Sequence, residues 1–284
     1  MSRRLLVGSL VLLFLLASVG GIAFAQQQQR QRDSRNRRNA PMPDTSVDRN
    51  GVPLWEVPPA FRSDVFTFVR VRNNSNYRSR SWMTDYPDSD LNFSFRLQQL
   101  TSLKVDPKGK VLELTDEALF DYPFLYMLEV GSLEFSEAEV LALRRYLSNG
   151  GFLMVDDFWG EDEWENFREQ MKRVFPDRDA VDLPLEHPIF HTVYDLKQKP
   201  QIPGIDVARR MRGTNVTWER YDAREVHYRG LFDDMGRMMA IICHNTDNGD
   251  AWEREGEEEW YFREFSEKFA YPMGINIVMY AMTH

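Results

Sequence analysis

The sequence contains a single cysteine, Cys243, among its 284 residues. One thiol cannot form an internal disulfide, and a zinc site built from several cysteines is excluded as well. Cys243 lies within AIICHNT, with no glycine on either side. It therefore lacks the sharp turn that presents a nucleophile in an elbow such as G-x-S-x-G. We expect a buried strand cysteine without a catalytic role.

The sequence also lacks the common nucleotide-binding and nucleophile motifs. It contains neither G-x-G-x-x-G nor a Walker P-loop, and no serine stands in a G-x-S-x-G setting. The formal net charge is −9, and the N-terminal 60 residues are basic, so the rest of the chain is strongly acidic. Nucleic-acid phosphates are bound by clustered Lys and Arg. The composition therefore argues against nucleic acid as a partner.

Residues 1–25 have the pattern of a secretory signal peptide. Two arginines precede an apolar run, residues 5–16, and an Ala-Phe-Ala cleavage site ends at Ala25. This pattern predicts a mature chain that starts at Gln26 and a periplasmic or secreted location. The alternative is an uncleaved N-terminal membrane anchor, because residues 5–25 are apolar over nearly the length that spans a bilayer.

The chain after the signal divides into a polar segment and a folded domain. Residues 26–60 are rich in Gln, Arg, Asn and Pro and have few large apolar side chains. Such a segment buries too little apolar surface to offset the entropy of ordering, so we predict a disordered linker. The folded domain is predicted to cover residues 61–284.

Within this domain, strand and helix patterns alternate. Strands are predicted at 64–72, 110–114, 123–130, 152–155 and 237–244, three of them as continuous apolar runs. Helices are predicted at 89–103, after a Ser136–Glu139 capping box, at 161–175, and at the C-terminus with an interruption near Pro272 and Gly274. Residues 180–235 are less regular. The alternation predicts a mostly parallel sheet with helices on both faces.

Polar residues follow the predicted buried strands, where open parallel sheets bind their ligands. Asp156 and Asp157 come directly after one strand. Asn245, Asp247 and Asp250 follow another strand, and two loop motifs, DYPDSD at 85–90 and HPIFH with His187 and His191, can reach the same edge. The candidate ligand-binding residues are therefore Asp156, Asp157, His187, His191, Asn245, Asp247 and Asp250.

Two interpretations of these residues remain open. The carboxylates and a histidine can hold a divalent cation, or one carboxylate can act as a general base. Alternatively, the aspartates cap helices and the histidines only form hydrogen bonds within their loops. No metal or cofactor is identified from the sequence.

Several blocks, in order, resemble one bacterial family. These blocks are DYPDSDLNFSFRLQQLTSL, DYPFLYM, FSEAEVLALRRYLSNGGFLMVDDFWG, HPIFH, NTDNGDAWE and GINIVMYAMTH, and they span most of residues 61–284. They are similar to the family called domain of unknown function 4159. The resemblance implies a three-layer α/β sandwich with a mostly parallel sheet, like the flavodoxin-like class I glutamine amidotransferases. Those enzymes use a cysteine on an elbow, which this chain lacks, so their activity does not carry over.

The leading functional prediction is an exported, non-catalytic domain of the cell envelope that binds a ligand or serves as a scaffold. Its partner would be a protein or a small molecule, and the membrane would be contacted only through an uncleaved N-terminal segment. The alternative is a hydrolase, with or without a metal, that acts on a carbohydrate or peptide at the carboxyl ends of the strands.

Overall fold

A computed structural model describes residues 49, 51–61, 64–73 and 81–284. The predicted signal peptide and most of the predicted linker lie outside the described residues. Within the described part of the linker, Trp55 donates a hydrogen bond from Nε1 to the carbonyl oxygen of Val105 at 2.8 Å. None of the helices in the described ranges combines the length and the apolar character needed to cross a membrane.

Seven strands form one mixed sheet in the order β2-β1-β3-β4-β7-β6-β5. Their bounds are β1 Val69–Val71, β2 Lys110–Leu112, β3 Phe124–Leu128, β4 Phe152–Asp156, β5 Val181–Asp182, β6 His227–Phe232 and β7 Met238–His244. The five strands from β2 to β7 are parallel, whereas β6 and β5 join antiparallel at one edge. The predicted α/β class and mostly parallel sheet are confirmed.

The central strands are buried on both faces, which explains their continuous apolar runs. In β4, Phe152 and Met154 belong to the core on one side of the sheet. Leu153 and Val155 alternate with them and belong to the core on the other side. The sheet therefore separates two hydrophobic cores, and each core requires its own cover of helices.

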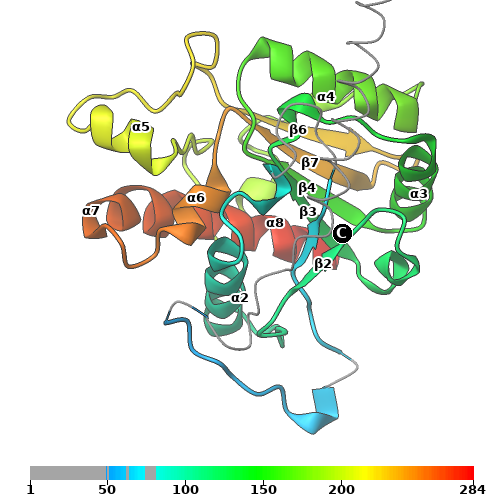
Figure 1. The fold of residues 1–284 in the computed structure, drawn as a ribbon, viewed down its shortest axis with the longest axis horizontal. Coiled ribbons are helices and arrows are strands. Elements are labelled where there is room, and N and C mark those ends of the chain that lie inside the picture. The colour runs from blue at the N-terminus through cyan, green and yellow to red at the C-terminus, as the bar shows by residue number, and fades with distance from the viewer. Residues whose placement is uncertain (1–48, 50, 62–63, 74–80) are drawn as a thin grey trace, which may run out of the picture. The chain divides into compact units, whose positions relative to one another are not determined.

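Helices cover both faces of the sheet (Figure 1). The α-helices are α2 Asp88–Leu100, α3 Glu137–Ser148, α4 Glu161–Val174, α5 Ile205–Arg210, α6 Asn248–Glu253, α7 Glu259–Tyr261 and α8 Tyr271–Thr283, with a π-helix at Phe262–Ala270. Short 3-10 helices lie at Pro59–Phe61, Ser81–Met83, Glu117–Asp121, Val130–Ser132 and Pro188–Phe190. α3 and α4 contribute to one core, whereas α2, α6 and α8 contribute to the other.

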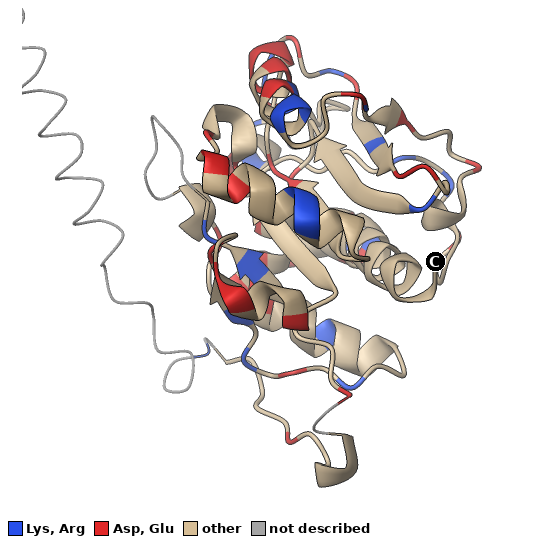
Figure 2. Cartoon of the chain, turned by 90° about the vertical axis from the view of Figure 1, so that its right-hand side faces the viewer, with Lys and Arg blue, Asp and Glu red and all other residues tan. Residues whose placement is uncertain are grey.

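Local signals explain where two of these helices begin. The predicted capping box of α3 is present, because the Ser136 side chain accepts from the backbone of Glu139 and the Glu139 side chain accepts from the backbone of Ser136. Both α3 and α4 start with acidic residues and end with basic ones (Figure 2). This arrangement favours each helix through its macrodipole.

Two details of the fold differ from the sequence prediction. The C-terminal helix is not interrupted near Pro272 and Gly274; the π-helix ends at Ala270 and α8 runs on from Tyr271. Pro272 stands directly after the change from π-helix to α-helix, and it has no N–H to donate to the preceding turn. The region 180–235, expected to be irregular, contains the two antiparallel strands β5 and β6.

Candidate functional site

Four residues in a strained backbone conformation mark the carboxyl ends of the parallel strands. Asp85, Glu129, Asp157 and Asn245 have φ values of 63°, 53°, 51° and 62°, and they are the only non-glycine residues of the described ranges with positive φ. Glu129, Asp157 and Asn245 follow β3, β4 and β7 directly. Left-handed residues of this kind concentrate at functional sites, where the surrounding structure holds them in place.

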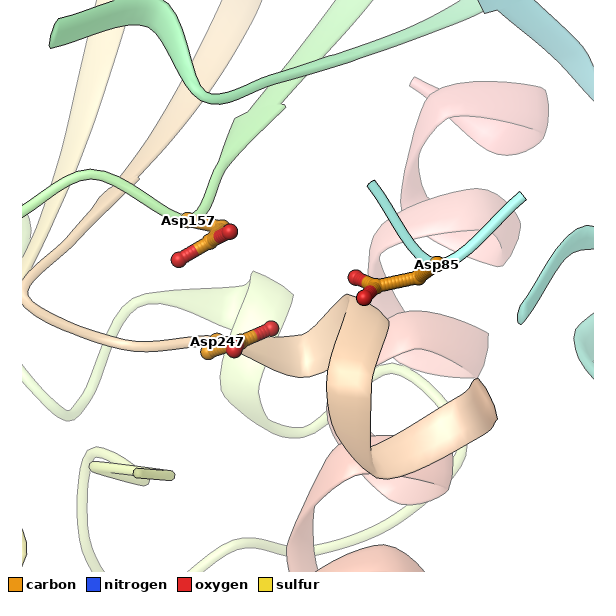
Figure 3. Close-up of side chains that lie close together, drawn as sticks. All are labelled: Asp85, Asp157 and Asp247. Carbon is orange, nitrogen blue, oxygen red and sulfur yellow. The ribbon is translucent and has the colours of Figure 1, made fainter. Parts of the chain in front are cut away.

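Three buried aspartates meet at this edge of the sheet. Asp85, Asp157 and Asp247 each contribute an oxygen atom, and these oxygens lie within 4.8 Å of one another. The three residues are 8%, 7% and 6% exposed. Figure 3 shows that they come from three separate segments and face a common space. The sequence predicted two of the three, Asp157 and Asp247, as site residues.

Asp157 and Asp247 each use one carboxylate oxygen to fix their position. Asp157 Oδ1 accepts a hydrogen bond from Trp159 Nε1 at 3.1 Å. Asp247 is the N-cap of α6, and its Oδ1 accepts from the backbone of Asp250 at 2.8 Å. The second oxygen of each receives no hydrogen bond from the described residues and remains available to a ligand.

The third aspartate, Asp85, is positioned by the buried Arg70 of β1. The Arg70 guanidinium donates to the carbonyl oxygens of Trp82 at 3.0 Å and Thr84 at 2.9 Å, and it is paired with Asp90. These contacts fix the segment that leads into Asp85. Its carboxylate lies over Gly249 of α6, where a Cβ would stand only 2.5 Å from Asp85 Oδ2. Position 249 therefore requires glycine.

Burial raises the pKa of all three aspartates well above the usual range. Desolvation is the main cause, and repulsion between neighbouring carboxylates adds to it. Glu129 and Glu219 belong to the same electrostatic environment, since their charges raise the pKa of Asp157 further. None of the three aspartates forms an ion pair with a Lys or Arg of the described residues, although the charges of Arg70 and Arg254 act against the rise in the pKa of Asp85.

Asp156, the neighbour of Asp157, has a different role. Its Oδ2 accepts from Tyr126 Oη at 3.0 Å and from the backbone of Asn248 and Gly249 at 3.0 and 3.1 Å. Its Oδ1 accepts from Asn248 Nδ2 at 2.8 Å. Asp156 therefore joins β4 to the first turn of α6. Burial raises its pKa to about 6, although these hydrogen bonds act in the opposite direction.

His244, the last residue of β7, and the next residue, Asn245, both form hydrogen bonds with the loop between β4 and α4. Asn245 Oδ1 accepts from the backbone of Gly160 at 2.8 Å, and its Nδ2 donates to the Glu225 carbonyl oxygen at 2.7 Å. His244 Nδ1 accepts from Arg229, because a guanidinium can only donate, and Nε2 then donates to the Gly160 carbonyl oxygen. Burial lowers the pKa of His244 to about 3.

The structure places the two predicted loop histidines in other contacts. His187 Nδ1 accepts from the backbone of Ile189 at 3.2 Å, and its ring contacts Tyr280. His191 Nδ1 lies 2.7 Å from Asp195 Oδ1, and its Nε2 lies 2.8 Å from the Leu185 carbonyl oxygen. The groups of potential metal ligands found among the described residues contain only carboxylates.

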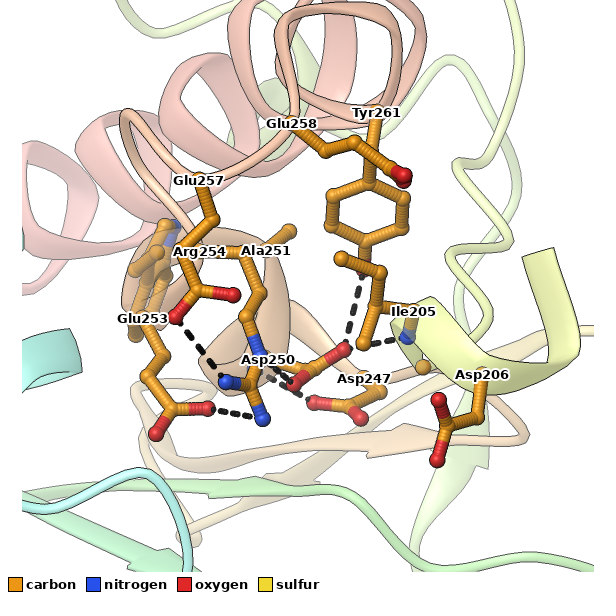
Figure 4. Close-up of polar contacts among 12 residues, drawn as sticks. Ile205, Asp206, Asp247, Asp250, Ala251, Glu253, Arg254, Glu257, Glu258 and Tyr261 are labelled. Carbon is orange, nitrogen blue, oxygen red and sulfur yellow. Dashed lines mark hydrogen bonds and ion pairs between the residues drawn. The ribbon is translucent and has the colours of Figure 1, made fainter. Parts of the chain in front are cut away.

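The remaining predicted residue, Asp250, belongs to a charge-compensated group with Glu253 and Arg254 (Figure 4). Asp85, Asp250 and Glu253 also bring oxygen atoms within 4.8 Å of one another. Arg254 lies against two of them, with Nε 3.0 Å from Asp250 Oδ1 and Nη2 2.8 Å from Glu253 Oε2. Asp250 Oδ2 also accepts from the backbone of Ile205, so its oxygens are occupied.

Sequence reasoning missed Asp85, Glu129 and Glu219 as site residues. Asp85 opens the DYPDSD motif at 85–90, and Glu129 lies near the end of the predicted strand at 123–130, directly after the observed β3. Glu129 could have been found by the rule that ligands bind at the carboxyl ends of parallel strands, whereas Asp85 follows no strand. Glu219 lies in the irregular region, where no pattern signalled its position beside Asp157.

The fold and the site together define an α/β protein with an acidic cluster at the carboxyl ends of its parallel strands. The family described as Domain of unknown function (DUF4159) matches residues 67–282. The chain therefore belongs to this family, as the sequence blocks indicated. No protein of curated function matches the chain.

Proposed function

We propose that the chain is an exported ligand-binding domain of the cell envelope, without catalytic activity, and that its ligand carries positive charge. One observation carries the proposal: Asp85, Asp157 and Asp247 form a buried acidic cluster in which no member forms an ion pair with a basic residue of the described ranges. A cationic ligand would offset the repulsion and the desolvation of these carboxylates.

The single cysteine does not supply a nucleophile that would favour an enzyme. Cys243 is buried within β7, and burial raises the pKa of its thiol well above the usual range, so that it stays protonated. The hydrolase alternative would use one of these carboxylates as a general base or a metal-activated water, and turnover of a carbohydrate or peptide is therefore an outcome that the experiment below must include.

The amidotransferase-like, flavodoxin-like three-layer sandwich is also part of this proposal. The parallel strands follow the order β2-β1-β3-β4-β7, which corresponds to the order 2-1-3-4-5 of flavodoxin-like sheets. Helix-covered cores on both faces support the same assignment. Export rests on the N-terminal pattern, and mass spectrometry of the native protein should find Gln26 as its first residue.

Thermal unfolding with a panel of ligands tests the function. Metal chlorides, polyamines and Lys-rich peptides form the cationic set, and neutral sugars and acidic peptides form the comparison set. A ligand at 100 times its Kd stabilises by about 2.7 kcal/mol, or roughly 5–10 °C for a domain of this size. We expect such a shift only with the cationic set.

The shift should disappear in the Asp157→Asn/Asp247→Asn double variant. It should persist in Asp206→Asn, which removes an exposed carboxylate on α5. Stabilisation by neutral or acidic ligands that both variants retain would refute the proposal, as would the absence of any shift. Release of product from glycosides or peptides by the wild-type protein, abolished in the double variant, would replace it with the hydrolase.

A further inference from the structure

The carboxylate of Asp85 is the most informative group of the acidic cluster. Its Oδ2 is fully buried and has no hydrogen-bond partner in the part of the chain that the structure describes. A buried polar atom without a partner costs free energy, and the cost is larger for a charged group. Figure 3 shows the Asp85 side chain directed toward Asp157 and Asp247. The missing partner of Asp85 therefore belongs in the space that the three aspartates share.

The three side chains offer only carboxylate oxygens, and this restricts the kind of partner. Oxygen ligands suit hard cations such as Ca²⁺, Mg²⁺ and Mn²⁺, whereas zinc and copper sites normally include His or Cys. Two oxygens on one ion lie at most about twice the metal–oxygen distance apart, which is about 4 Å for Mg²⁺ and about 5 Å for Ca²⁺. The 4.8 Å limit among the three oxygens is compatible with one such ion.

The neighbouring acidic group does not provide a second site. Asp85, Asp250 and Glu253 are equally close, but Arg254 already contacts Asp250 and Glu253. A cation placed there would be repelled by this guanidinium. The cluster of Asp85, Asp157 and Asp247 has no such neighbour in ion-pair contact among the described residues. The charge distribution therefore favours a single ion.

We infer that Asp85, Asp157 and Asp247 together bind one hard divalent cation, and this assignment rests on the proposed function. The three carboxylates occupy three coordination positions of the ion. The positions that remain are filled by water or by an oxygen atom of a second ligand, since Ca²⁺ takes six to eight ligands and Mg²⁺ takes six. The ion would connect the segment before α2 with the ends of β4 and β7.

Isothermal titration calorimetry of the chelator-treated mature chain with Ca²⁺, Mg²⁺ and Mn²⁺ tests the assignment. We expect a stoichiometry of one and an affinity at least tenfold weaker in Asp85→Asn and in Asp247→Asn. Asn caps a helix as well as Asp does, so the second variant removes the charge and keeps the cap of α6. Circular dichroism would verify that each variant is folded.

Two control variants sharpen the outcome. Asp206→Asn and Glu253→Gln should both bind with unchanged affinity and stoichiometry. A stoichiometry of two, or loss of binding in Glu253→Gln alone, would overturn the single-ion assignment. If no metal binds while a polyamine or Lys-rich peptide still gives a shift that depends on Asp157, the metal assignment fails and the proposed function stands. If no cationic ligand binds, both fail.

Discussion

Asparagine substitutions at the adjacent residues Asp156 and Asp157 should have opposite effects on the metal-free protein. Asp156 accepts hydrogen bonds at both oxygens, three at Oδ2 and one at Oδ1. The Asp156→Asn side chain must direct its NH₂ group toward one of these sets of donors. The less costly orientation gives up the bond from Asn248 Nδ2 and leaves two buried NH₂ groups facing each other.

The expected cost follows from these contacts. Loss of one charge-assisted hydrogen bond with a buried donor left unpaired costs about 2 kcal/mol, after allowance for the relief of burying a charge. For a domain of this size that corresponds to a fall in Tm of about 4–8 °C. Asp157→Asn keeps an oxygen for Trp159 Nε1, tolerates the left-handed backbone, and removes one uncompensated carboxylate. Its Tm should equal or exceed that of the wild-type protein.

Thermal and urea unfolding at pH 7.5 in the presence of a chelator would measure both changes. The urea midpoints should follow the same order, with an unchanged m-value. An Asp156→Asn variant as stable as the wild-type protein would show that the carboxylate does not hold α6. An Asp157→Asn variant that is destabilised as much as Asp156→Asn would refute the distinction between a structural and a functional aspartate.

Two further predictions concern buried groups outside the acidic cluster. Because the pKa of His244 is lowered to about 3, the unfolded chain binds a proton below pH 6.5 that the folded protein does not, so acid should destabilise the fold. Between pH 7.5 and 4.5 this amounts to about 2–3 kcal/mol. The His244→Gln variant should lose that part of the pH dependence in urea titrations. Identical pH dependence in the two proteins would contradict the burial of His244 as a neutral imidazole. Native Cys243 should resist thiol reagents until the protein unfolds, and Cys243→Ala should retain cation binding; rapid labelling of the native protein would contradict its burial.

The sequence predicts the parallel core well because the residue pattern of each central strand is compatible with only one kind of element. The runs at β3, β4 and β7 are too short for helices and apolar at every position, so only strands buried on both faces fit them. β6 has no such pattern. His227–Phe232 mixes a histidine, an arginine and a glycine with apolar residues, and it becomes a strand by pairing antiparallel with β7. Tertiary context, rather than local periodicity, decides this element.

The candidate site was only partly accessible from the sequence for a similar reason. Asp157 and Asp247 could be placed because each lies within a few residues of a recognisable strand end. Asp85 depends on Arg70, whose guanidinium binds the carbonyl oxygens of residues 82 and 84 and fixes the segment before α2. A pairing of this kind, between a buried arginine and backbone carbonyls more than ten residues away, leaves no local pattern. The sequence also predicts His187 and His191 at the site, yet both histidines form hydrogen bonds with backbone groups of their own loop.

The pair Asp156–Asp157 shows how one backbone angle separates structure from function. Alternation along β4 places Asp156 on the same face as Phe152 and Met154, beside Tyr126 and the first turn of α6. Continued alternation would direct the next side chain to the opposite face. Instead, Asp157 has a φ of 51°, which turns the chain so that its carboxylate joins Asp85 and Asp247. A left-handed non-glycine residue costs about 1–3 kcal/mol, and three buried carboxylates add their repulsion. The hydrogen bonds of Asp156, which join β4 to α6, help to offset the backbone strain and the repulsion between carboxylates. Binding of a cation at the cluster would remove the repulsion.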